Sequence, residues 1–269
     1  MPTRVCAYIP ARNEEKHLPG CLDALLGQTR SPDNVILIDD GSTDRTGKIG
    51  RKKGCIVVKL KDRGRTLVES PELSQVHNAG LRECRRLKAD YVLVVGADHI
   101  LSGSYLEKLL DEMQSDSTLA ISSGYISGEQ RIFPSGSGRL ISRDFLSQVS
   151  WRYPYINGWE AYFVFKALSL GYSVKIIATP SKVTRGTFIK RRWGSEQGGL
   201  EIGKSMRRLG YWKPYAWLRC LRLFSRPTLA LAMLLGYITE THGAYDEDVA
   251  AYIKRWQKAR MVGYVQNLV

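Results

Sequence analysis

The chain has 269 residues, 43% of them hydrophobic, and a formal net charge of +14. This length is enough for one sizeable core, or for a domain with an appendage, and no internal repeat or low-complexity tract is present. The charge is concentrated between Lys182 and Arg226, where twelve Lys or Arg stand against two Glu. We therefore expect an anionic partner such as phosphate, a membrane surface or nucleic acid. The alternative is the solvated face of a basic protein.

The first residues lead directly into an apolar segment without a signal peptide, so we expect a cytoplasmic protein. The five cysteines lack metal-binding spacing and are expected to be buried free thiols in a reducing compartment. The apolar run 228–238 is too short for the roughly 20 residues that cross a bilayer. The sequence therefore predicts a protein that binds at a membrane surface rather than one that spans the membrane.

The first hundred residues alternate short apolar runs with amphipathic segments. This pattern predicts strands at 4–9, 35–39, 55–60 and 90–95, and helices near 14–28, 43–53, 72–88 and 104–114. Such alternation is typical of an α/β fold with a doubly wound, mostly parallel sheet flanked by helices. Beyond it we expect strands at 119–124 and 172–178, and helices near 142–149 and 159–170.

An acidic motif, Asp39-Asp40-Gly41-Ser42-Thr43-Asp44, follows the second predicted strand. Ligands of open α/β sheets bind at the carboxyl ends of the strands, so two carboxylates here suit recognition of a base or ribose, or metal binding. The alternative is a solvated turn in which Ser42 or Thr43 caps a helix.

Further motifs stand in a matching order along the chain. The run 10–15 (PARNEE) follows the first strand, Gln28-Thr29 closes the first helix, and Gly96-Ala97-Asp98-His99 ends the fourth strand. With these motifs, residues 3–180 resemble glycosyltransferase family 2, which has the Rossmann-like GT-A fold. The resemblance implies an inverting enzyme that uses a nucleoside-diphosphate sugar. It also implies a GT-A domain over 1–184, with a nucleotide-sugar half at 1–100 and an acceptor half at 101–184.

The resemblance implies a set of donor-site residues. Asp98 is the leading ligand for Mn²⁺ or Mg²⁺ and His99 is a second, because their run occupies the place of the family's Asp-x-Asp motif. Gly96 stands where the family has the first acid, which leaves fewer acidic ligands. A helix-start or turn residue is the alternative for Asp98. The residues expected to contact the nucleotide are Pro10, Ala11, Arg12, Glu14, Asp39, Asp40, Arg65 and Ala97, with Arg63 beside Arg65.

The acceptor half contains the expected general base. Glu160 follows Trp159, and counting back from Gly171 gives it the second position of the family's acidic pair. Partial burial beside Trp159 is expected to favour this role, and direct displacement with one base inverts the anomeric carbon. Ala161 follows, so no second acid adjoins it. An ordinary acid in the first turn of a helix is the alternative.

The region 185–269 is expected to be a basic, helical tail. Arg191, Arg192 and Trp193 partly match the Gln-x-x-Arg-Trp motif of processive relatives, although Ile189 stands at the Gln position. We expect them at the diphosphate, at an acceptor phosphate or at a membrane.

A helical wheel of 217–224 gives one apolar face and one basic face, which is typical of a helix at a membrane interface. Packing of the apolar face as core is the alternative. A further helix is expected at 246–261. The apolar face contains Trp217, Cys220, Leu221 and Phe224, and the basic face Arg219, Arg222 and Arg226.

The leading hypothesis is thus a metal-dependent, inverting glycosyltransferase with a lipid-phosphate or glycan acceptor at the cytoplasmic membrane face. Gly96 and Ala161, both at acidic positions of the family, motivate the alternative of a non-catalytic nucleotide- or membrane-binding relative. A nucleotidyltransferase would carry a Gly-rich loop with Lys or Arg after the first strand, which 10–15 lacks. Nucleic-acid binding would depend on charge alone, since no recognition motif is present.

Overall fold

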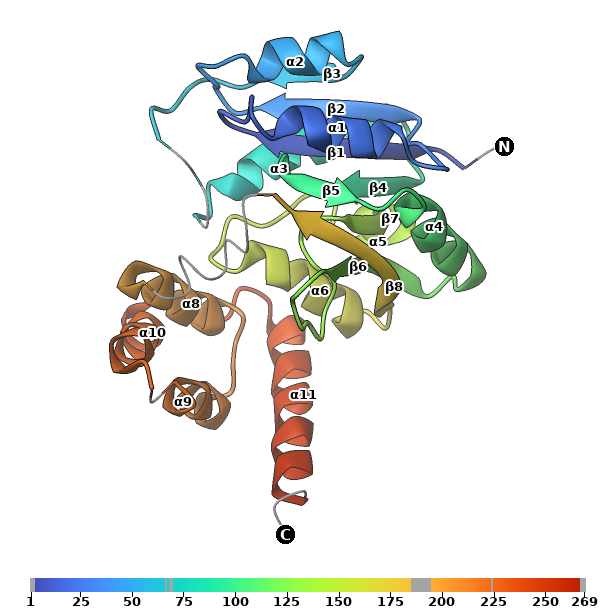
Figure 1. The fold of residues 1–269 in the computed structure, drawn as a ribbon. Coiled ribbons are helices and arrows are strands. Elements are labelled where there is room, and N and C mark those ends of the chain that lie inside the picture. Colours follow the sequence, from blue (N-terminus) through green and yellow to red (C-terminus); the bar gives the residue numbers. More distant parts are fainter. Residues whose placement is uncertain (1–2, 66, 68–69, 185–194, 224, 267–269) are drawn as a thin grey trace. The chain divides into compact units, whose positions relative to one another are not determined.

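The computed structural model describes residues 3–65, 67, 70–184, 195–223 and 225–266 (Figure 1). The chain forms two compact units. The sheet unit consists of Met1–Val68, Glu72–Tyr153 and Gly171–Gly186. The helical unit consists of Glu69–Pro71, Pro154–Leu170 and Thr187–Val269.

The described strands belong to the sheet unit and form one sheet in the order β3-β2-β1-β4-β7-β6-β8-β5. β1 pairs in parallel with β2 and β4, and β2 with β3, whereas β7 runs antiparallel to β4 and β6. The mostly parallel α/β sheet is thereby confirmed. The strands are β1 (Val5–Ala11), β2 (Asn34–Asp39), β3 (Ile56–Lys59), β4 (Tyr91–Val94), β5 (His99–Leu101), β6 (Leu119–Ile126), β7 (Arg139–Ser142) and β8 (Ser173–Val183).

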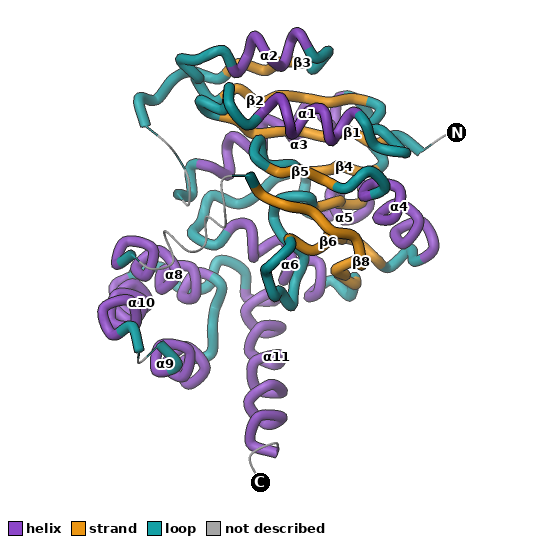
Figure 2. The backbone as a smooth tube through the Cα atoms, viewed as in Figure 1, coloured by secondary structure: helices purple, strands orange, loops and turns teal. Residues whose placement is uncertain are grey.

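Helices alternate with the first strands, as the periodicity predicts (Figure 2). In the sheet unit they are α1 (Leu18–Leu26), α2 (Thr46–Lys52), α3 (Leu73–Arg86), α4 (Tyr105–Ser115) and α5 (Arg143–Gln148). In the helical unit they are α6 (Trp159–Ser169), α8 (Glu196–Arg208), α9 (Lys213–Leu221), α10 (Pro227–Thr239) and α11 (Glu247–Gln266).

Two helices begin later than the sequence predicts. α1 begins at Leu18 rather than near residue 14, after a turn in which Asn13 has a positive φ of 54°. α2 begins at Thr46, so neither Ser42 nor Thr43 caps it. Instead, Oδ1 of Asp44 accepts a hydrogen bond of 2.9 Å from the backbone N of Thr46. The residues expected at the starts of these two helices belong instead to the loops that follow β1 and β2.

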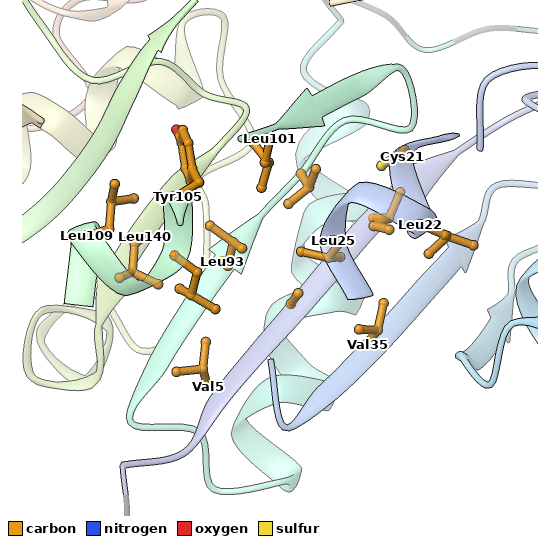
Figure 3. Packing of buried hydrophobic residues seen from close by; sticks show 14 of the residues in the cluster. Val5, Cys21, Leu22, Leu25, Val35, Leu93, Leu101, Tyr105, Leu109 and Leu140 are labelled. Carbon is orange, nitrogen blue, oxygen red and sulfur yellow. The ribbon is translucent and has the colours of Figure 1, made fainter. Parts of the chain in front are cut away.

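One apolar core lies between the parallel strands and the helices α1 and α4 (Figure 3). Helix α1 supplies Leu18, Cys21, Leu22 and Leu25, all buried, whereas Leu26 is exposed. All five cysteines are buried and free, as the composition predicts. This core fixes the strands whose ends carry the acidic motifs.

Helix α6 groups with the C-terminal helices, which differs from the predicted boundary at residue 185. The physical reason is direct packing. The rings of Phe165 and Trp256 lie 6.0 Å apart, and Nζ of Lys166 lies 2.8 Å from a carboxylate oxygen of Asp246. The segment 154–170 therefore belongs to the helical unit although it interrupts the sheet unit in sequence.

Helices α8 and α10 approach closely through glycines. A Cβ added to Gly203 would lie 2.0 Å from the carbonyl oxygen of Met233, and one added to Gly236 would lie 2.1 Å from that of Leu200. Only glycine permits this approach.

The apolar face predicted for the 217–224 helix is buried at one position and exposed at two others in the structure. Cys220 packs into the core of the helical unit with Met206 and Met233, whereas Trp217 and Leu221 are exposed. Part of the predicted apolar face is therefore packed and part is exposed, and Phe224 of this face lies outside the described residues. No helix within the described parts of the chain is long and apolar enough to cross a membrane.

Candidate active site

The carboxyl ends of β1, β2 and β4 share one edge of the sheet because these strands run in parallel. Ala11, the last residue of β1, stands in register with Asp39, the last residue of β2. The backbone N of Asp40 then donates to the carbonyl oxygen of Ala11 at 2.9 Å. The first and second sequence motifs therefore meet at this edge.

Arg12 ties the loops at this edge together. Its Nη1 donates to the carbonyl oxygens of Asp40 at 2.5 Å and Gly41 at 3.2 Å, and its Nη2 lies 2.6 Å from Oδ1 of Asp62. One guanidinium thus fixes the turn after β2 and the loop after β3 against each other. We infer a positioning role for this side chain, which adds to the predicted nucleotide contact.

Gly41 allows the two loops to approach. Its φ is +67°, and a Cβ at this position would lie 2.4 Å from the Cα of Asp62. Both facts require glycine, because an L side chain disfavours this φ and the clash involves backbone.

We expect Gly41→Ala to lower the free energy of unfolding by about 1–3 kcal/mol and to weaken nucleotide binding, because the 60–65 loop must move. Urea unfolding and nucleotide titration measure the two effects. Gly54→Ala is the matched control, since Gly54 has a φ of +79° with nothing within 4 Å of its added Cβ. Equal losses of both quantities in the two variants would contradict the role of close packing at Gly41.

The two acids of the β2 motif have different surroundings. Asp39 is buried, and its Oδ1 accepts from the backbone N of Ser42 at 2.9 Å, so it holds the turn. Asp40 is also buried, and its Oδ1 lies 2.8 Å from Nη1 of Arg63. Burial raises the pKa of Asp40, although Arg63 and Arg12 oppose the shift. Asp40 and Arg63 thus form an acceptor and a donor side by side.

The remaining predicted nucleotide contacts lie around this pair. Ala11 is buried and Pro10 is partly buried in β1, and the backbone N of Glu14 donates to Oγ1 of Thr46 at 2.8 Å. Arg65 is exposed, and its Nη2 lies 3.2 Å from Oε1 of Glu72. Of the two arginines in the 60–65 loop, Arg63 rather than Arg65 therefore contacts the acidic motif.

Ser137 occupies the space beside Gly96 in the turn after β4. Its Oγ accepts from the backbone N of Gly96 at 2.7 Å and lies 2.6 Å from Nδ1 of His99. A Cβ on Gly96 would lie 3.1 Å from this Oγ and 3.2 Å from Oδ1 of Asp98. The sequence did not reveal Ser137, which lies in the Gly/Ser-rich segment far along the chain.

His99 has an interior position. It is 1% exposed, its Nε2 is buried without a hydrogen-bond partner in the described structure, and burial lowers its pKa to about 4. Ser137 engages the other nitrogen, and the role of His99 as a second metal ligand stays a prediction. Ala97, which precedes Asp98, is buried as well.

Asp98 remains the carboxylate at this turn that suits a divalent cation. Among the described residues, no three His, Cys, Asp or Glu side chains converge on a common point. A single carboxylate nevertheless fits Mg²⁺ or Mn²⁺, because Mg²⁺ is commonly held by one or two carboxylates together with substrate phosphates and water. The residues present thus fit a metal that arrives with a diphosphate.

Glu160 lies in the first turn of α6, in the helical unit. Trp159 is buried whereas Glu160 is exposed, which corrects the expected partial burial. The reason is helical geometry, since consecutive side chains point in different directions and Trp159 takes the inward one. The predicted residues Arg191, Arg192 and Trp193 lie outside the described part of the chain.

A mainly parallel sheet with acidic and basic side chains where β1, β2 and β4 end is the arrangement of α/β domains that bind ligands at the carboxyl ends of their strands. The chain belongs to glycosyl transferase family 2, because the model of that family matches residues 6–169. This confirms the resemblance inferred from the sequence motifs.

Curated relatives match a part of the chain. Glycosyltransferase GlyG of Streptococcus pneumoniae is 30% identical over 129 residues, which is 46% of this chain and 40% of GlyG. The uncharacterized glycosyltransferase EpsJ of Bacillus subtilis is 28% identical over 122 residues, which is 45% of this chain and 33% of EpsJ. This chain therefore spans less than half the length of either relative.

Solved structures share the fold over nearly the whole chain. The mannosyltransferase PcManGT of Pyrobaculum calidifontis, in complex with GDP-Man and Mn²⁺, has a TM-score of 0.60 at 16% identity and covers 93% of this chain and 73% of its own. TarS of Staphylococcus aureus has a TM-score of 0.55 at 14% identity and covers 93% and 50%. The GT-A fold is thereby confirmed.

Proposed function

We propose that the protein transfers a sugar from a nucleoside-diphosphate sugar to a lipid-phosphate or glycan acceptor, with inversion at the anomeric carbon. The observation that carries this proposal is the shared edge of β1, β2 and β4, where Arg12, Asp40 and Asp98 lie within a family 2 domain. A single displacement at that carbon inverts its configuration, and proton NMR of the first product distinguishes α from β.

Asp40 and Arg63 suit a particular kind of base. A carboxylate–guanidinium pair can accept from a ring N–H and donate to the adjacent carbonyl oxygen, which uracil and guanine present, whereas adenine and cytosine have an unprotonated ring nitrogen beside an amino group. To engage a base, Arg63 must release or share Asp40. Structural neighbours with GDP-Man and with UDP support the same two bases.

The leaving diphosphate requires charge stabilisation. Asp98 would hold Mn²⁺ or Mg²⁺, which supplies a Lewis acid for the phosphate oxygens when bound. The Mn²⁺ in the PcManGT structure supports this cofactor. Arg191, Arg192 and Trp193 would add cations and an aromatic surface near a phosphate, in agreement with the basic composition of that segment.

Glu160 would remove the proton from a hydroxyl acceptor as the general base. A phosphate acceptor is already ionised and needs this proton transfer much less. We propose the cytoplasmic face of a membrane as the place of reaction, because an acceptor that carries both lipid and phosphate would explain the basic tail.

The test is the melting temperature of the protein with UDP, GDP, ADP and CDP, each with and without Mn²⁺, followed by assays with the matching nucleotide sugars. A ligand that binds only the folded state stabilises it by about 2.7 kcal/mol at 100 times its Kd, and this stabilisation raises the melting temperature. We expect a Mn²⁺-dependent shift with UDP or GDP and none with ADP or CDP. Equal shifts with all four would contradict base selection by Asp40 and Arg63, and no shift would contradict the donor site.

A non-catalytic nucleotide-binding protein is the second candidate. Two positions favour it. Gly96 has no acidic side chain and contacts Ser137 instead, and position 161 is alanine rather than an acid. Nucleotide binding in the melting experiment, without transfer to either acceptor class, would establish it in place of the enzyme.

A further inference from the structure

Helices α9 and α10 belong to the helical unit (Figure 1). Each carries an exposed apolar stripe. On α9, Trp217 and Leu221 are 49% and 67% exposed. On α10, Leu231, Leu235 and Ile238 are 58%, 45% and 60% exposed. The spacings of four and three residues align each set along one side of its helix. We call these five residues the apolar stripes.

The stripes are not needed for the core of the helical unit. α9 buries Ala216 and Cys220, and α10 buries Met233 and Tyr237 in the same cluster. Each helix therefore has an inner apolar side that packs and a further apolar side that faces solvent. Single exposed apolar residues need no explanation, but aligned ones indicate an interaction surface.

The charged residues on α9 and between the two stripes are all basic, and Glu240 stands at the end of α10, two residues after Ile238. No acid stands between Glu201 and Glu240, whereas Lys213, Arg222 and Arg226 are exposed on α9 and at the α9–α10 junction. Arg222 and Arg226 lie in sequence between the two stripes. Apolar residues with Arg222 and Arg226 between them in sequence match the boundary between anionic headgroups and acyl chains.

We propose that the apolar stripes of α9 and α10 insert into the headgroup–acyl boundary of an anionic phospholipid bilayer, with Lys213, Arg222 and Arg226 at the headgroups. The proposal deepens the proposed function and rests on it for the biological reason, because docking would bring the protein to a lipid-phosphate acceptor. It differs from the helix expected from the sequence, since Cys220 packs inside and α10 supplies most of the apolar contact.

The test is co-sedimentation of the full chain with vesicles of phosphatidylglycerol and of phosphatidylcholine, without donor or acceptor. We expect binding to the anionic vesicles that weakens as salt is raised. Leu221→Gln with Leu231→Gln should weaken this binding tenfold or more, since each exposed leucine loses its transfer into the acyl boundary. Ile132→Gln is the control, because Ile132 is 64% exposed in the sheet unit.

The charge contribution is tested separately. Arg222→Gln with Arg226→Gln should weaken binding about thirtyfold, from about fivefold for each basic residue at an anionic surface. Arg82→Gln with Arg85→Gln removes the same net charge from exposed positions of α3 and should have little effect. An equal loss in both pairs would overturn the docking face, since net charge alone would then explain binding.

Other outcomes also decide against the proposal. Equal binding to both vesicle types, or to neither, overturns it. Sedimentation equilibrium without vesicles detects a second copy as the occupant. A dimer that Leu231→Gln dissociates would assign the stripes to a protein interface instead. Nucleotide shifts of the melting temperature are measured on the same samples, so failure of vesicle docking is distinguishable from failure of the donor site.

Discussion

Replacing Asp98 with Asn is expected to lower kcat/KM for sugar transfer by about a thousandfold, because several kcal/mol of stabilisation of the departing diphosphate would be lost. Within the described turn after β4, Asp98 is the acidic side chain. Position 96 is glycine, with Ser137 beside it, and His99 is buried with one nitrogen engaged by Ser137. The whole carboxylate contribution of the turn after β4 therefore depends on one residue.

The measurement has two parts, which separate metal binding from catalysis. The first is the transfer rate as Mn²⁺ is varied, and the second is the Mn²⁺ dependence of the nucleotide-induced melting shift. Asp111→Asn is the matched control, because Asp111 is an exposed acid on α4 of the same unit. If Asp98→Asn retains both the rate and the Mn²⁺ dependence, Asp98 is not the ligand and another group neutralises the diphosphate.

The edge of the sheet at which β1, β2 and β4 end could be predicted because it depends on local patterns. An apolar run followed by an acidic motif indicates the carboxyl end of a buried strand, and parallel pairing then brings Asp40 next to Arg12. The choice of Arg63 over Arg65 as the partner of Asp40 could not be predicted. It depends on the course of the 60–65 loop, which Gly41 permits through its positive φ and missing side chain.

Strand β7 and the contact of Ser137 could not be predicted from the sequence, because both depend on pairing between distant segments. β7 has only four residues and follows a Gly/Ser-rich segment, so neither its length nor its composition indicates a strand. Ser137 reaches Gly96 only because β7 pairs with β4.

The interfacial face was predicted from the wheel of one helix. Such a wheel cannot distinguish Cys220, which packs against α10, from Leu221, which faces solvent. A pattern within one segment identifies an apolar side, but a neighbouring helix decides how much of that side is covered.

Replacing Glu160 with Gln is expected to have an effect that depends on the acceptor. With a hydroxyl of a glycan, loss of the general base should lower kcat by about 10²- to 10⁴-fold. With a polyprenyl phosphate, the attacking oxygen is already ionised near neutral pH, and the loss should be less than about tenfold. One variant assayed on two acceptors therefore reports which chemistry the protein performs.

Glu247→Gln is the matched control for this experiment, because Glu247 is also an exposed acid in the first turn of a helix in the same unit. An equal, small effect of both variants on both acceptors would mean that Glu160 only stabilises the start of α6, as acids near helix N-termini commonly do. A large loss confined to the glycan acceptor would assign proton removal to Glu160. Full activity on the phosphate in that same variant would show that the protein can act on an ionised acceptor without a base, which is the chemistry that a lipid-docked enzyme would meet.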